Sequence, residues 1–138
     1  MKLTCIPVLF LMALALFQPV FAQSNEPLAI VMTADGPIMP PMLEYFKRGI
    51  ETAEQSHAEV LVIQLNTPGG SVETMLSIIQ VMRASKVPVV VYVSPNNAIA
   101  GSAGALITMA GHVSAMAPKT AIGAASPIDS SGADIEST

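Results

Sequence analysis

Short apolar runs rich in valine and isoleucine alternate along the chain with longer segments in which apolar residues recur at helical spacing. The short runs Leu28 to Thr33, Val60 to Leu65 and Val89 to Val93 are predicted as strands. A helix beginning at Pro40-Pro41 separates the first two strands, and a second helix, ended by Ser85 to Pro88, separates the next two. This alternation is typical of parallel β-α-β units.

The run Val60 to Leu65 is apolar at nearly every position, so we expect that strand to be covered on both faces. After the third strand, small residues crowd together from Ala98 to Ala105, and a helical period resumes at Leu106 to Met109. The remaining segments are predicted as a short strand at Val113 to Ala117, a turn at Pro118 to Thr120, an extended piece at Ile122 to Ala125 and a loop at Ser126 to Thr138. The predicted fold class is α/β with a mostly parallel sheet.

The first 22 residues differ from the rest of the chain. Lys2 is followed by a nearly unbroken apolar stretch, a break at Gln18-Pro19 and the small residue Ala22, which together indicate a secretory signal at 1–22 and an exported domain at 23–138. The alternative is an uncleaved membrane anchor, because the uncharged stretch is close to the shortest length that spans a bilayer.

Charge and cysteine content exclude several function classes. The formal net charge of −4 argues against nucleic acid as a partner. The single cysteine, Cys5, lies inside the predicted signal, so the exported part has no thiol for a disulfide, a nucleophile or a thiolate metal site. His57 and His112 do not fall in a ligand-spaced motif, and we expect no metal and no cofactor.

The first chemical candidate is Pro68-Gly69-Gly70, which follows a predicted buried strand at its carboxyl end, where open α/β sheets place their sites. Paired glycines let a substrate approach the main chain closely, so that an amide N–H can point at a developing oxyanion. The alternative interpretation is a plain strand-to-helix turn.

The second candidate is Ser102, a lone hydroxyl among small residues in the segment Ala100 to Gly104. If a helix begins near Ser102, its Oγ lies at the positive end of the helix dipole, which favours a nucleophile and the charge of a tetrahedral intermediate. The alternative is that Ser102 caps the helix and that the small residues allow close helix packing.

The two candidates occur together, with one β-α-β unit between them. In the order and spacing of these segments, the sequence resembles the ClpP/crotonase superfamily. More specifically, it resembles the NfeD-type membrane-associated Ser-Lys proteases, the stomatin-operon-partner proteases. The resemblance runs from about Leu28 to Ile128, and the stretches that carry it are Leu65 to Gly70, Ser85 to Val93, Ala98 to Gly104, Ala115 to Pro118 and Ile122 to Ala125.

The resemblance implies roles for individual residues. Ser102 matches the nucleophile, and Gly69, Gly70 and Ala103 match the positions whose backbone amides form the oxyanion hole. The Ser-Lys branch uses a downstream lysine as general base, which would lie just past Thr138, so the resemblance implies a fold incomplete at its C-terminus and an inactive fragment. Lys119 is a poor substitute because a lysine in an exposed turn stays charged.

By resemblance, the chain is part of an exported serine endopeptidase at the extracytoplasmic or periplasmic face of a membrane. Its substrates would be apolar, membrane-proximal peptide segments, with a stomatin-like membrane protein as a candidate partner. The full-length relatives are membrane-associated and form homo-oligomers. Two alternatives stay open: a non-catalytic scaffold that binds peptides through the same groove, and acyl-CoA chemistry of the crotonase type.

Overall fold

The computed structural model describes residues 26–125, which form a parallel sheet, a smaller sheet and helices. The predicted signal at 1–22 and the predicted loop at Ser126 to Thr138 lie outside the described residues. The elements in chain order are β1 (Ala29–Asp35), α2 (Pro40–Gln55), β2 (Val60–Asn66), α3 (Val72–Ala84), β3 (Val89–Val93), β4 (Ile99–Gly101), α4 (Ala103–Ala110), β5 (Val113–Met116) and β6 (Ala121–Gly123).

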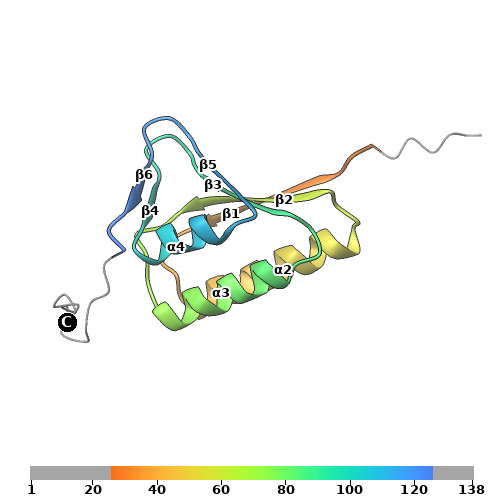
Figure 1. Cartoon of the computed structure of the whole chain (residues 1–138), viewed down its shortest axis with the longest axis horizontal. Helices are drawn as coiled ribbons and strands as arrows, with labels where there is room; N and C mark the ends of the chain where they lie inside the picture. Colours follow the sequence, from red (N-terminus) through yellow and green to blue (C-terminus); the bar gives the residue numbers. More distant parts are fainter. Residues whose placement is uncertain (1–25, 126–138) are drawn as a thin grey trace, which may run out of the picture.

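The main sheet has four strands in the order β1-β2-β3-β5, all parallel. Each new strand is added on the same side of the previous one. Crossovers between parallel strands are nearly always right-handed, so crossovers that all advance in one direction place their helices on one face of the sheet. Figure 1 shows α2, α3 and α4 together on that face.

The core lies between this face and the helices. Along β2 and β3 every second residue is buried, namely Leu61, Ile63, Leu65, Val89, Val91 and Val93. The helices contribute fully buried Phe46 from α2, Ile78 and Met82 from α3 and Ile107 from α4. Each element therefore buries one face, as amphipathic elements do in a layered domain.

The prediction that β2 is covered on both faces is wrong for the described residues. The strands' opposite face carries a row of aligned valines, Val31, Val62, Val90 and Val113. Val31 is 58% exposed and Val113 is 56% exposed, while the two central valines are half-buried. An apolar run in sequence does not distinguish a strand covered twice from one covered once.

A second, two-stranded sheet pairs β4 with β6 in parallel. The extended piece predicted at Ile122 to Ala125 corresponds to β6 at Ala121–Gly123, whereas β4 was not predicted. Ser102 therefore follows directly from a strand and precedes a helix, which begins at Ala103.

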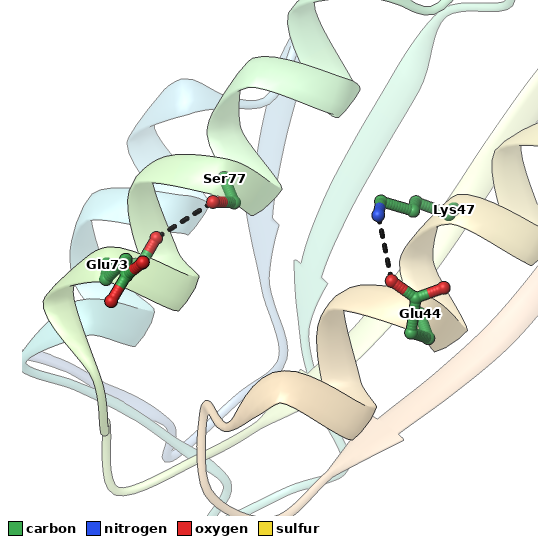
Figure 2. A network of polar contacts seen from close by, with 4 residues as sticks. All are labelled: Glu44, Lys47, Glu73 and Ser77. Carbon is green, nitrogen blue, oxygen red and sulfur yellow. Dashed lines mark hydrogen bonds and ion pairs between the residues drawn. The ribbon is translucent and has the colours of Figure 1, made fainter.

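The outer surfaces of α2 and α3 carry local polar contacts (Figure 2). The Nζ of Lys47 lies 2.8 Å from Oε1 of Glu44, and Oγ of Ser77 donates to the carbonyl oxygen of Glu73 over 3.0 Å. Across the part of the chain that the structure describes, no helix combines the length and the apolar character that crossing a membrane requires.

Candidate active site

Two loops meet beyond the carboxyl ends of β2 and β3. The loop after β2 contains Pro68, Gly69 and Gly70, and the segment after β3 leads through β4 to Ser102. The backbone N–H of Thr67 donates to the carbonyl oxygen of Ile99 over 2.7 Å, and the N–H of Gly101 donates to that of Thr67 over 2.9 Å. These bonds hold β4 beside the first loop, so the two predicted motifs form one site.

Ser102 has an unusual backbone, with φ 48° and ψ −115°. A non-glycine residue in such a sparsely populated conformation costs about 1–3 kcal/mol and persists only where its surroundings hold it. Its N–H donates to the carbonyl oxygen of Gly123 over 2.8 Å, which connects it to β6. Ser102 occupies the N-cap position of α4, yet its side chain makes no capping hydrogen bond. Ser102 thus has the cap position that the alternative interpretation expects but lacks the capping hydrogen bond, and its half-buried hydroxyl is not committed to its own helix.

The glycines allow the two loops to touch. A Cβ placed on Gly69 would lie 2.8 Å from Cβ of Ser102, and one placed on Gly101 would lie 2.8 Å from the carbonyl oxygen of Pro68. Real Cβ atoms essentially never come so close. Gly69 also has φ +113°, a conformation that L side chains rarely adopt. The alternative of a plain turn at Pro68-Gly69-Gly70 omits this direct contact with Ser102.

The amides around Ser102 are not equivalent. The N–H of buried Gly69 donates to Oγ1 of Thr67 over 3.1 Å. Gly70 is exposed, and among residues 26–125 no acceptor is bonded to its N–H or to that of Ala103 at the start of α4. The glycine loop and the start of α4 therefore each carry one amide without an acceptor among residues 26–125, whereas the amide of Gly69 is already bonded within its own turn.

The two basic residues that follow Ser102 in the described part of the chain are placed elsewhere. The Nδ1 of His112 accepts a hydrogen bond of 3.1 Å from the N–H of Val89, the first residue of β3. This contact lies at the amino end of β3, whereas the site lies beyond the carboxyl ends. Lys119 occupies an exposed turn with φ 61°. Residues 26–125 contain no group of three or more His, Cys, Asp or Glu side chains arranged to hold a metal ion.

Sequence reasoning missed two contributors to the site. Asn66, at the end of β2, donates from Nδ2 to Oδ1 of Asp35 over 3.2 Å and accepts the N–H of Ile99 at Oδ1 over 3.0 Å. Thr67, which is 1% exposed, binds Gly69 through its hydroxyl. Both directly precede Pro68, but their roles depend on contacts with residues distant in sequence, which spacing alone does not reveal.

Comparison with known proteins finds relatives that are named as membrane proteins. Residues 31–137 match the family described as the NfeD1b N-terminal domain. The chain is 42% identical over 113 residues to the membrane-bound protease PH1510 of Pyrococcus horikoshii, an alignment that covers 82% of the chain and 25% of that protein. The chain thus spans about a quarter of the length of the curated relatives it matches.

Solved structures show the same fold. A structure described as the 1510-N membrane-bound stomatin-specific protease, a lysine-to-alanine mutant in complex with a substrate peptide, is 40% identical with a TM-score of 0.75, over 83% of this chain and 53% of that one. The ClpP protease catalytic domain of Plasmodium falciparum matches with a TM-score of 0.55 at 14% identity, over 64% of this chain and 53% of that one, which shows the fold alone. The expected α/β, ClpP-like fold with a mostly parallel sheet is confirmed.

Proposed function

Because the chain belongs to the family of NfeD1b N-terminal domains, we propose that it is part of the catalytic domain of an exported serine endopeptidase, with Ser102 as the nucleophile. Residues 1–22 would be the export signal and residues 23–138 would belong to the protease domain. A relative with 42% identity is named a membrane-bound protease, which supports the reaction class.

The observation that carries the proposal is the pairing of an uncapped serine with unbonded amides. Ser102 is held in a strained conformation with its hydroxyl free of the helix cap. The N–H groups of Gly70 and Ala103 have no acceptor within residues 26–125. Preorganised amide donors of this kind stabilise the oxyanion of a tetrahedral intermediate, which is often the largest single contribution to acyl-transfer catalysis.

In the proposed mechanism, Oγ of Ser102 attacks the peptide carbonyl while a general base takes the hydroxyl proton. The carbonyl oxygen becomes an oxyanion that accepts hydrogen bonds from the amides of Gly70 and Ala103, with Gly69 as the remaining candidate donor. The intermediate collapses by releasing the amine, which receives the proton, and water then hydrolyses the acyl-enzyme.

The base is proposed to be a lysine that follows this part of the full-length protein. A buried lysine whose pKa is lowered by desolvation is neutral and able to accept the proton. Lys119 is the sole lysine between Ser102 and Thr138, and it lies in an exposed turn. The structure of the relative with a bound substrate peptide carries a lysine-to-alanine substitution, and a further structure of it carries a serine-to-alanine substitution.

The substrates are proposed to be apolar, membrane-proximal peptide segments, with a stomatin-like membrane protein as the target. The description of a related structure as a stomatin-specific protease supports this class. The full-length protein would be membrane-associated and homo-oligomeric, with its protease domain on the extracytoplasmic side.

The test is hydrolysis of an apolar peptide by the full-length protein, together with labelling by a serine-reactive phosphonate. Ser102→Ala is expected to abolish both. Ser77→Ala is the matched control, because it removes a serine hydroxyl that is bonded only to the carbonyl of Glu73 on α3. Labelling that persists after Ser102→Ala would refute the nucleophile assignment. Peptide binding without hydrolysis by the unchanged protein would favour a scaffold instead.

A further inference from the structure

Thr67 contacts both halves of the site with different atoms of one side chain. Its Oγ1 accepts the N–H of Gly69 over 3.1 Å. The same hydroxyl also donates to the carbonyl oxygen of Gly69 over a longer distance of 3.4 Å. Its methyl carbon Cγ2 occupies the space where a Cβ on Gly104, in the first turn of α4, would lie. Thr67 is 1% exposed, so water does not compete for these contacts.

The hydroxyl decides which amide of the glycine pair is available. Gly69 is buried and its N–H is bonded to Thr67, whereas Gly70 is exposed and its N–H has no acceptor within residues 26–125. The carbonyl oxygen of Gly69 also accepts the N–H of Ile38 over 2.8 Å. Both ends of Gly69 are therefore tied down, which fixes the peptide unit that joins it to Gly70.

The methyl group relates this loop to the serine. Because Cγ2 of Thr67 lies against Gly104, a shift of Thr67 moves either the glycine loop or the start of α4. Ser102 immediately precedes that helix. The methyl group thus packs the glycine loop against the helix that Ser102 precedes, while the hydroxyl alone bonds the glycine pair.

We propose that Thr67 is a positioning residue of the peptidase site: its hydroxyl holds Gly69 so that the amide of Gly70, and not that of Gly69, is the oxyanion donor facing Ser102. The inference rests on the proposed function. It also predicts a specific kinetic signature, because a donor aligned with the oxyanion acts in the transition state and contributes little to substrate binding.

The test compares Thr67→Val with Thr67→Ser in the full-length protein, using steady-state hydrolysis of an apolar fluorogenic peptide. Valine keeps the shape and loses the acceptor, which leaves the buried N–H of Gly69 unsatisfied. We expect Thr67→Val to lower kcat by about tenfold to a hundredfold with little change in KM, as a small misplacement of a catalytic donor does. Thr67→Ser keeps the acceptor and is expected to retain most of kcat.

Thr108→Val is the matched control. Thr108 is also 1% exposed, and its Oγ1 donates to the carbonyl oxygen of Gly104 over 2.8 Å inside α4. Its loss removes a buried threonine hydroxyl without touching the glycine loop, so kcat is expected to stay unchanged. Should Thr67→Val fail to fold, Thr67→Cys replaces it: a thiol has the shape of the serine hydroxyl but is a weaker acceptor, and kcat is expected to fall below that of Thr67→Ser.

Equal losses of kcat in Thr67→Val and Thr67→Ser would overturn the inference, since the methyl and not the hydroxyl would then matter. A rise in KM at constant kcat would also overturn it. The proposed function is tested separately by Ser102→Ala. If that variant is inactive while Thr67→Val matches the unchanged protein, only the role of Thr67 is wrong; if Ser102→Ala stays active, both proposals fail.

Discussion

Gly104→Ala tests whether the two loops of the site are packed as tightly as the structure shows. Gly104 is buried in the first turn of α4, where alanine would ordinarily be the better helix former. An added Cβ would, however, lie well within 3.0 Å of Cγ2 of Thr67, closer than real Cβ atoms come. Rotating Thr67 out of the way would break the bond from Gly69 to its hydroxyl.

The expected change in the free energy of unfolding of Gly104→Ala is the sum of two opposing contributions. Overpacking a close-packed interior costs typically about 1–3 kcal/mol, and this site is expected at the upper end because Thr67 cannot rotate freely. Replacing a helical glycine by alanine stabilises the helix by about 0.8–1.0 kcal/mol. The net loss is therefore about 2 kcal/mol, which lowers the melting temperature of a domain of 150–250 residues by about 4–8 °C.

Thr67→Ser supplies the decisive comparison, because it deletes the methyl group that meets the new Cβ. Alone it removes one buried methyl and is expected to cost about 0.5–1.5 kcal/mol. In the double variant the methyl group has in effect moved from residue 67 to residue 104, so the volume is conserved. We expect the double variant to be more stable than Gly104→Ala alone, with a coupling free energy of about 2 kcal/mol.

Thermal unfolding is measured for four forms of the full-length protein: the unchanged protein, Gly104→Ala, Thr67→Ser and the double variant. Thr108→Ser combined with Gly104→Ala is the control, because it deletes a buried threonine methyl of α4 that is not among the atoms nearest to the added Cβ. Additive losses in Gly104→Ala with Thr67→Ser would refute the reasoning, since the need for glycine at 104 would then have another origin.

Two further predictions concern the helical face and the histidine. Ile78 is fully buried in α3, so Ile78→Ala should lower the free energy of unfolding by about 2–5 kcal/mol. Leu76 in the same helix is 54% exposed, so Leu76→Ala should change the free energy of unfolding by less than about 0.5 kcal/mol. Equal losses in the two variants would contradict the burial of one helix face. His112→Ala should cost about 1 kcal/mol in thermal unfolding by removing the acceptor of the Val89 amide, while peptide hydrolysis by the folded protein stays unchanged. A loss of activity as complete as in Ser102→Ala would instead make His112 the base.

Much of the main sheet could be predicted because its signals are local. The run Val89 to Val93 coincides with β3, and the helix predicted from Pro40 begins there, since proline fits the first turn of a helix. The coverage of β2 could not be predicted in the same way. Whether the face that carries Val62 is covered depends on the direction in which the crossovers advance, and no single apolar run encodes that direction.

The three-residue strands β4 and β6 are still harder to predict from the sequence. β4 is too short and too rich in small residues to show an alternating pattern. It is a strand because Thr67 donates its N–H to the carbonyl oxygen of Ile99 and accepts the N–H of Gly101, and because β6 pairs with its other side. The motif at Ser102 was recognisable in sequence, but the difference between the amides of Gly69 and Gly70 was not. That difference depends on one hydroxyl whose bonding only the folded loop defines.

Three glycines at the contact between the two segments make physical sense only together. Gly69 lacks a side chain where Cβ of Ser102 lies, and Gly101 lacks one where the carbonyl oxygen of Pro68 lies. In the first turn of α4, Gly104 likewise leaves room for the methyl group of Thr67. Each absent Cβ thus corresponds to an atom of the other loop, so the two segments are complementary surfaces of one packed contact. Their co-occurrence in sequence is therefore far more informative than either motif alone, and a side chain added to one loop should be tolerated only where the other loop gives up the matching atoms.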